Sequence, residues 1–311
     1  MAQICTLGEL HPGAPVALTI GVFDGVHRGH QALIGQTVPR ARLLGGQSVA
    51  LTFYPHPRAV LAPATPVYEL ASLNERLHLI AALGLDVVAT LEFTRELSLL
   101  PAEAFLDLVQ QHINLRELWV GPDFALGHRR SGTVARLNKL GAQRGFTVHT
   151  VAPVDIGGRV SSSRIRDLIA AGDVEQAALL LGRHYRIEGL VVAGERRGRR
   201  LGFATANLAL TGPYLLPANG IYAVYAELEG PRLPAVANVG VRPTFGHHSR
   251  LVEVHILDFD RTIYGERVGV HMVKRLREEV RFPSVAALVG QMQRDVSDSR
   301  ALLAGEERIS G

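Results

Sequence analysis

Two histidines lie three residues apart in a glycine-rich stretch, GVFDGVHRGH, that runs from residue 21 to residue 30. The stretch follows the apolar run VALTI and precedes a helical pattern. Such a turn between a buried strand and a helix presents backbone N–H groups and a helix N-terminus to an anion. His27 and His30 are one helical turn apart, so both imidazoles can donate hydrogen bonds to phosphate oxygens. The glycines let a nucleotide approach the backbone closely.

Two other interpretations of this histidine pair stay open on the residues alone. The pair could ligate a metal, although no third ligand is evident in the sequence. The two residues could also be ordinary histidines of a loop and a helix surface. A Walker-type phosphate loop is excluded, because Gly-Lys followed by Ser or Thr occurs nowhere in the chain.

Three consecutive serines, Ser161, Ser162 and Ser163, precede a helical pattern that carries Arg166. Serine is a common helix N-cap, and capping alone would explain the three residues. Their hydroxyls and the helix N-terminus can also hold a pyrophosphate group, with the Arg166 guanidinium as a bidentate clamp.

A second polar cluster, GERRGRRLGFATANL, combines arginines with Gly194, Gly198 and Gly202 at four-residue spacing. A solvated basic loop or a nucleic-acid patch is one interpretation. Against nucleic acid stands the lack of interleaved aromatic residues or of a known nucleic-acid-binding motif. The composition favours a flap over a triphosphate.

Three further residues of the second half suggest phosphate or metal chemistry. Thr205 and Asn207 are two apart on an extended segment, so their side chains face the same way. Their neutral oxygens suit Mg²⁺ when phosphates supply the negative charge. Glu253 lies in the apolar run LVEVHILDF, where a buried carboxylate is costly without a partner. A salt bridge at the edge of the core is the alternative to a chemical role.

The elements that must position these residues follow two patterns. Apolar runs at 16–23, 48–55, 85–93, 117–122 and 146–153 alternate with helical patterns. This alternation predicts a Rossmann-like parallel sheet with helices on both faces. From residue 185 on, runs at 185–194, 220–230, 234–241, 251–259 and 266–276 are joined by turn-rich spacers. They predict a small antiparallel β-barrel, with a last helix near 284–303 on its outside. The predicted domains are 1–182 and 184–307.

Composition bounds the class of protein. A chain of 311 residues favours two domains. A net charge of +4 suits polyanionic substrates as well as nucleic acid. A single cysteine excludes an internal disulfide framework and a cysteine-rich zinc site. The first residues lack the features of a signal peptide, and no apolar run approaches a membrane span. We expect a soluble, cytoplasmic protein with no membrane partner.

The motifs, taken in order, carry a family resemblance. GVFDGVHRGHQALI resembles the H-x-G-H signature of the nucleotidyltransferase superfamily, in its FMN adenylyltransferase branch, and TFYPHP, NERLHLIAALGLD, VGPDFALGHRRSGT and VSSSRIRDLIAAGDVEQAALLLGRHY extend the match. In the second half, GERRGRRLGFATANL, GIYAVYA, ANVGVRPTFG, VEVHILDFDRTIYGERVGV and RLREEVRFPS resemble riboflavin kinase. Together they resemble the prokaryotic bifunctional FAD synthetases, across nearly the whole chain.

The resemblance implies two transferase reactions. Riboflavin would be phosphorylated to FMN at the C-terminal site, and FMN would be adenylylated to FAD at the N-terminal site with release of pyrophosphate. The implied partners are riboflavin, FMN, FAD and ATP with Mg²⁺, and not nucleic acid; self-association is left open. The alternatives are a protein that retains only one of the two activities and a non-catalytic protein that binds flavin or nucleic acid.

The resemblance also assigns roles to residues. At the first site, the catalytic residues would be His27, His30 and Arg166. ATP would be bound by Gly21, Phe23, Asp24, Gly29, Asp123 and the three serines. The flavin pocket would be shaped by Phe53, His56 and Pro57. At the second site, Glu253 would take the proton from the riboflavin 5′-hydroxyl. ATP would be bound by Gly194, Gly198, Gly202, Thr205 and Asn207, the last two together with Mg²⁺. The flavin would be approached by Arg277 and Phe282.

Three positions depart from the family pattern. Tyr54 replaces a frequent acidic residue in TFYPHP, and Leu126 replaces a usual Phe. Ala204 replaces the proline that usually precedes Thr-Ala-Asn. A proline would fix φ there and preorganise the following segment.

Overall fold

The computed structural model describes residues 2–194, 198, 201–244 and 247–310. The chain divides into two compact units, Met1–Tyr68 with Ser72–Ser162, and Glu69–Ala71 with Ser163–Gly311. The domain limits 1–182 and 184–307 stay a prediction, and residues 163–182 are grouped with the second unit.

The first unit is built on a parallel sheet, as predicted. Its six strands lie in the order β1-β4-β3-β2-β5-β8. Their bounds are β1 Gln3–Thr6, β2 Pro15–Ile20, β3 Gln47–Tyr54, β4 Val87–Glu92, β5 Asn114–Val120 and β8 Thr147–Thr150. All pairings within the sheet are parallel. The sequence did not predict β1, whose side chains are mostly exposed at the sheet edge.

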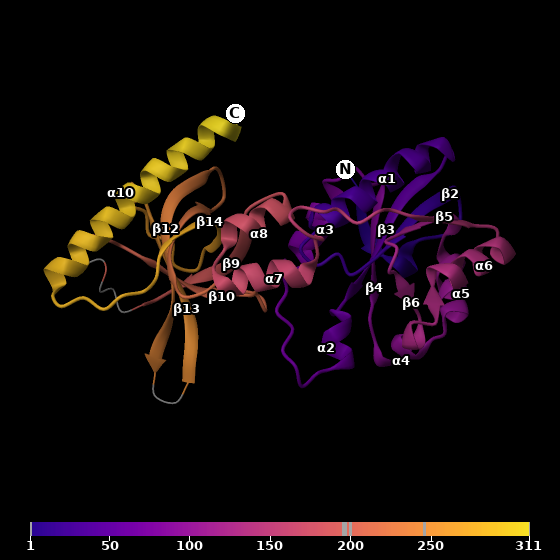
Figure 1. The fold of residues 1–311 in the computed structure, drawn as a ribbon, viewed down its shortest axis with the longest axis horizontal. Helices are drawn as coiled ribbons and strands as arrows, with labels where there is room; N and C mark the ends of the chain where they lie inside the picture. Colours follow the sequence, from indigo (N-terminus) through magenta and orange to yellow (C-terminus); the bar gives the residue numbers. More distant parts are fainter. Residues whose placement is uncertain (1, 195–197, 199–200, 245–246, 311) are drawn as a thin grey trace. The chain divides into compact units, whose positions relative to one another are not determined.

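Helices cover both faces of this sheet (Figure 1). On β3, Val49 and Leu51 pack on one side with apolar residues of α5 and α6, whereas Ala50 packs on the other with residues of α1 and α3. This alternation is the period of two that a strand imposes on its side chains. The other elements of the unit are η1 Leu7–Glu9, α1 Arg28–Leu43, α2 Pro57–Leu61, α3 Leu73–Ala81, α4 Arg95–Leu99, α5 Ala102–His112, β6 Ala125–Leu126, η2 His128–Arg130, β7 Gly132–Thr133 and α6 Val134–Arg144.

The second unit contains the predicted antiparallel barrel. The barrel is closed in the order β10-β13-β12-β11-β14-β9. Its strands are β9 Tyr185–Val192, β10 Ala206–Leu210, β11 Gly220–Glu227, β12 Arg232–Thr244, β13 His247–Ile256 and β14 Arg267–Arg277. Leu208, Val252 and Val239 are opposite one another on adjacent strands and are buried in the barrel.

The helices α7 Ser162–Ala171, which begins at the unit boundary, α8 Val174–Leu181 and α10 Val285–Ser310 accompany the barrel. The last helix packs on β11, β12 and β14 (Figure 1). There the Tyr225 hydroxyl donates to the carbonyl of Leu303 (3.0 Å), and the Ser299 hydroxyl donates to the carbonyl of Ala235 (3.2 Å). None of the helices in the described part of the chain has the length and apolar character needed to cross a membrane.

Candidate active sites

The loop between β2 and α1 lies where the strand order of the parallel sheet reverses. The chain passes from β2 to β3 and β4 on one side, and later to β5 and β8 on the other. In open parallel sheets, ligands bind outside the carboxyl ends of the strands at such a point. The predicted phosphate-binding stretch therefore lies at the position that the fold favours for a nucleotide.

His27 and His30 lie against each other at the start of α1. Their ring centroids are 3.6 Å apart and the ring planes differ by 15°. His27 is the N-cap of the helix, and its Nδ1 accepts from the backbone N–H of His30 (3.3 Å). Because Nδ1 of His27 is an acceptor, the proton of the neutral ring is on Nε2. The two stacked imidazole rings thus lie together at the N-terminus of α1.

Burial keeps His30 uncharged. It lowers the pKa of His30 well below the usual 6.5, and the charges of His27 and Arg76 lower it further. The Nδ1 atom of His30 is buried, and no group among the described residues forms a hydrogen bond with it. A neutral imidazole can donate a hydrogen bond through one ring nitrogen and accept one through the other.

The loop that precedes these histidines is tightly packed and strained. Phe23 and Val26 have φ of 51° and 41°, a region that non-glycine residues seldom adopt. The Phe23 ring is 1% exposed, and a Cβ on Gly21 would lie 2.8 Å from its Cε1. A Cβ on Gly29 would lie 3.1 Å from Cε1 of His27. Gly21 and Gly29 therefore make room for rings of the site, while their predicted contacts with ATP stay predictions.

The serine segment reaches the same loop. The Ser162 hydroxyl donates to the carbonyl of Asp24, a buried residue of the loop, over 3.0 Å. α7 begins at Ser162, so Ser161 directly precedes the helix. From Ser163 on, α7 is grouped with the second unit, and that part of the helix includes Arg166. The roles of Ser161, Ser163 and Arg166 stay predictions.

Other predicted residues of the first site lie at or after the ends of β3 and β5, the strands on either side of β2. Phe53 lies near the end of β3 and contacts Phe93 edge-on, with ring centroids 5.7 Å apart. His56 caps α2, its Nδ1 accepting from the N–H of Arg58 (3.1 Å), and Pro57 is the first residue of that helix. Asp123 follows β5 and forms an ion pair with Arg159.

The residues that the sequence did not single out include Arg76. Its side chain is buried, with 0% exposed. Nη1 donates to the carbonyl of Val22 (3.0 Å), and Nη2 donates to the carbonyl of Phe53 (3.2 Å). It thereby joins the segment that follows β2 to the end of β3. No sequence signal marked it, because an arginine in a helical pattern is most often a surface residue.

On the barrel, the predicted kinase residues form a row. Asn207 on β10 is directly opposite Glu253 on β13, which is opposite Asn238 on β12. Side chains opposite one another in an antiparallel pair share a face. Glu253 is half-buried and lies on the face opposite to the buried Val252 and Val254, so it is outside the apolar interior that the sequence suggested.

The row extends at both ends. Thr205 directly precedes β10, two residues before Asn207. On the other side of Asn238 come Ile221 and then Arg277. The sequence missed Asn238, whose buried Oδ1 has no hydrogen-bond partner among the described residues.

Glycines of the basic loop pack closely on this row. A Cβ on Gly194 would lie 2.2 Å from Nδ2 of Asn207, and one on Gly198 would lie 2.3 Å from the carbonyl oxygen of Phe203. Gly202 has a φ of +90°, which favours glycine. The predicted flap arginines, residues 196, 197, 199 and 200, are outside the described residues.

Arg277 and Phe282, predicted to approach the flavin, contact each other and α10. The Arg277 guanidinium forms two hydrogen bonds with the buried Asp295 (2.9 and 2.6 Å). Its Cζ lies 5.7 Å from the centroid of the Phe282 ring. The ion pair fixes Arg277 at the end of the polar row.

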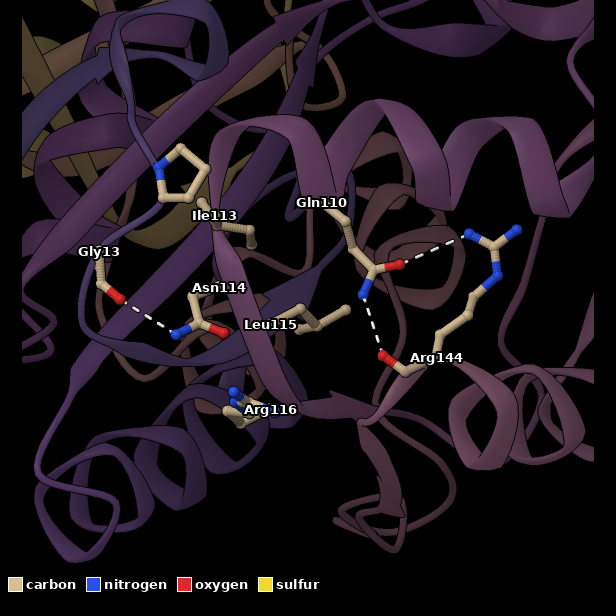
Figure 2. Close-up of a pocket in the computed structure, with 8 residues that line it drawn as sticks. Gly13, Gln110, Ile113, Asn114, Leu115, Arg116 and Arg144 are labelled. Carbon is tan, nitrogen blue, oxygen red and sulfur yellow. Dashed lines mark hydrogen bonds between the residues drawn. The ribbon is translucent and has the colours of Figure 1, made fainter.

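Figure 2 shows a pocket of the first unit with a volume of about 290 Å³. It includes Asn114, the first residue of β5, and is therefore at the amino end of that strand, opposite to the histidine loop. Its polar groups bond to one another: Asn114 donates to the carbonyl of Gly13, and Gln110 donates to the carbonyl of Arg144 (Figure 2). The pocket is not part of either candidate site.

His, Cys, Asp and Glu side chains of the described residues form no group of three that could hold a metal ion. The oxygen donors of the row in the second unit are instead the hydroxyl of Thr205, the amide of Asn207 and the carboxylate of Glu253. Mg²⁺ prefers oxygen ligands and is commonly held by few protein groups together with substrate phosphates. The residues of the row fit a cation that arrives with ATP.

Comparison with known proteins matches both units. Residues 11–164 match the family described as FAD synthetase, and residues 181–303 match the family described as riboflavin kinase. Relatives named bifunctional riboflavin kinase/FMN adenylyltransferase are 40% identical in Pseudomonas fluorescens, over 92% of both chains, and 37% identical in Escherichia coli K12, over 93% of both.

A solved structure shares the fold. A crystal structure titled "Macrolide-efflux Protein from Streptococcus pneumoniae" is 32% identical, with a TM-score of 0.89 over 96% of this chain and 99% of that one. Its title names an activity that differs from the names of the relatives, so this match supports the fold rather than a function.

Proposed function

This chain belongs to the family of bifunctional riboflavin kinase/FMN adenylyltransferases, and we propose that its two units divide the two reactions between them. The second unit phosphorylates riboflavin to FMN, and the first converts FMN to FAD. The chain is thus a transferase that uses riboflavin, FMN and ATP. The match of each half to a different family supports this division.

In the first unit, a phosphate oxygen of FMN attacks the α-phosphorus of ATP. The bond from that phosphorus to the bridging oxygen breaks, and pyrophosphate leaves. No covalent intermediate with the protein is needed, so the protein contributes alignment and charge stabilisation. His27 and His30 bind the phosphate oxygens, and the serines at the start of α7, with Arg166, hold the pyrophosphate.

The observation that carries this assignment is the stacked histidine pair. The two rings lie at a helix N-terminus at the switch point of the sheet, and His30 has a buried nitrogen with no hydrogen-bond partner among the described residues. The neutral His30 imidazole can donate a hydrogen bond to developing negative charge without adding a second cation beside Arg76. Gly21, Phe23, Asp24, Gly29 and Asp123 would line the nucleotide, and Phe53, His56 and Pro57 the flavin.

In the second unit, the 5′-hydroxyl oxygen of riboflavin attacks the γ-phosphorus of ATP, and ADP leaves. Glu253 accepts the hydroxyl proton. Thr205 and Asn207 bind Mg·ATP, with Gly194, Gly198 and Gly202 beside the phosphates. When bound, Mg²⁺ neutralises charge on the phosphates. Arg277 and Phe282 contact the flavin at the far end of the row.

Two further assignments belong to this proposal. The adenylyltransferase domain is residues 1–182, and the kinase domain is residues 184–307. A cytoplasmic location stays a prediction from the sequence. The partners are small molecules, and nothing in the chemistry of either site calls for nucleic acid.

Separation of FMN from FAD after incubation with riboflavin and Mg·ATP tests the proposal. The wild-type protein should form FMN first and FAD later. In Glu253→Gln, the side chain keeps its size but cannot accept the proton, so kinase turnover should fall by about 10²–10⁴-fold. The same variant supplied with FMN should form FAD at the wild-type rate.

Several outcomes would contradict the proposal. FMN without FAD, or FAD only from added FMN, would mean that one activity has been lost. Neither product would mean a flavin binder. Near-wild-type FMN formation by folded Glu253→Gln would place the base elsewhere, and a Glu253→Gln variant with lower thermal stability but normal turnover would make Glu253 a structural residue.

A further inference from the structure

Arg76 is a buried cation that contacts the loop between β2 and α1 at the first site. Its guanidinium donates to two backbone carbonyls, those of Val22 (3.0 Å) and Phe53 (3.2 Å). Val22 follows β2 and Phe53 is near the end of β3, and these strands are neighbours in the sheet. One side chain thus joins the carboxyl ends of two strands at the edge where the nucleotide is expected.

The carbonyl of Val22 is held by a second donor as well. The hydroxyl of Thr52, a buried residue of β3, donates to it over 3.0 Å. The next residue, Phe23, has a φ of 51°, and Val26 has a φ of 41°. Such conformations persist only where surrounding contacts enforce them. Arg76 and Thr52 supply contacts of this kind at the first strained position.

The strained loop in turn positions the two imidazoles. The Phe23 ring is buried beneath Gly21 and meets the His30 ring edge-on, with centroids 5.3 Å apart. The His30 ring stacks on His27 at 3.6 Å. The contacts therefore run without a gap from Arg76 through Val22 and Phe23 to both histidines.

We propose that Arg76 is a positioning residue for adenylyl transfer, which fixes the Val22 carbonyl and thereby the orientation of the His27–His30 pair toward ATP. The proposal rests on the proposed function of that pair. Arg76 acts through the loop, and its guanidinium also opposes a positive charge on His30. No contact between Arg76 and substrate is required.

Two substitutions test this role. Arg76→Met removes both hydrogen bonds and the charge but keeps a side chain of similar length. Arg76→Lys keeps the charge but loses the planar guanidinium, which donates to both carbonyls. We expect the kcat for FAD formation from FMN to fall roughly 10–100-fold in Arg76→Met, with a smaller fall in Arg76→Lys and a lesser change in KM for ATP. Riboflavin phosphorylation by the same molecules should be unchanged, and the fluorescence of Trp119, which is in the same unit as Arg76, measures the folded fraction of that unit.

A second readout separates positioning from stability. The charged or titratable side chains that shift the pKa of His30 are those of His27 and Arg76. An NMR titration of labelled histidines should show the pKa of His30 rising toward 6.5 in Arg76→Met, together with changed ring shifts for His27 and His30. A lower melting temperature with normal kcat and unchanged histidine signals would overturn the proposal.

If Arg76→Met does not fold, Thr52→Val tests the same contact with the Val22 carbonyl. It removes one of the two donors to Val22 and should lower the adenylylation kcat several-fold. Thr90→Val is its matched control, because Thr90 lies opposite Thr52 on β4 but donates to the carbonyl of Cys5 on β1 (3.3 Å) and not to that of Val22. Equal effects of the two variants would overturn the proposal.

His30→Ala distinguishes a failure of this inference from a failure of the proposed function. If His30→Ala stays fully active, the proposed function of the pair is wrong. If His30→Ala is inactive while folded Arg76→Met has normal kcat, the site stands and only the role of Arg76 is wrong.

Discussion

At the scale of single residues, both sites depend on close packing around a polar side chain. The His27 ring is closely packed against Gly29, and the Asn207 amide is closely packed against Gly194. In each case any larger residue would displace a group that is predicted to bind phosphate or Mg·ATP. Glycine is thus required for space, apart from any direct contact with a nucleotide.

Gly194→Ala tests this at the kinase site. The added Cβ would lie 2.2 Å from Nδ2 of Asn207, so the amide must move. We expect the KM for Mg·ATP in riboflavin phosphorylation to rise roughly 10-fold or more, because a displacement of about 1 Å can cost up to about 10²-fold. Steady-state kinetics of FMN formation gives the value.

Gly290→Ala is the control for this change. Gly290 lies within α10, and its Cβ would meet Nη1 of Arg294 at an ordinary 3.9 Å. The substitution should leave both activities unchanged and stabilise the helix by up to about 1 kcal/mol. Equal kinase defects in both variants would show that Gly194 has no special role.

At the scale of elements, charged side chains link β9, β11 and β14 on the barrel. Glu227 on β11 accepts from Nε2 of His271 (2.7 Å) and from Nε of Arg186 (3.0 Å). Burial of the His271 ring lowers its pKa from 6.5 to about 4, against the raising effect of Glu227. The ring is therefore neutral at neutral pH, and its hydrogen bond to Glu227 joins β14 to β11.

This burial predicts a pH dependence of stability. Between pH 6.5 and about 4 the unfolded chain binds a proton at His271 that the folded chain does not. The free energy of unfolding should therefore be highest above pH 6.5 and fall as the pH drops toward 4, by on the order of 3 kcal/mol from this group. Urea unfolding followed by circular dichroism at pH 7 and pH 4.5 measures the change.

His271→Gln should reduce that pH dependence, because Gln can donate to Glu227 but does not titrate. The fluorescence of Trp119, the only tryptophan of the chain, follows the first unit and serves as a reference within the same molecule. An identical pH dependence in the variant and the wild type would show that His271 is not the source.

Elements were easier to predict from sequence than the contacts of individual side chains. The buried strands and the helix that starts at His27 follow from apolar runs and from glycine placement, which depend on neighbours in sequence. The strand β1 has little apolar character and forms only by pairing with β4. The burial of Arg76 and the outward face of Glu253 depend on strand register and on distant carbonyls, which no local pattern records.

At the scale of the whole molecule, each unit has its own core and its own set of polar residues. The histidine loop depends on the parallel sheet, and the row of Asn207, Glu253 and Asn238 depends on the register of the barrel. The central claim is therefore that one chain carries two chemically independent transferase sites.

His30→Ala tests that claim most directly, with products separated after incubation with riboflavin and Mg·ATP. The account predicts that FMN accumulates at the wild-type rate while FAD formation is lost, because the barrel site does not need the imidazole. Addition of Glu253→Gln protein, whose first site is intact, should then restore FAD from the released FMN. Loss of both activities in folded His30→Ala, or FAD formation at the wild-type rate, would contradict the account.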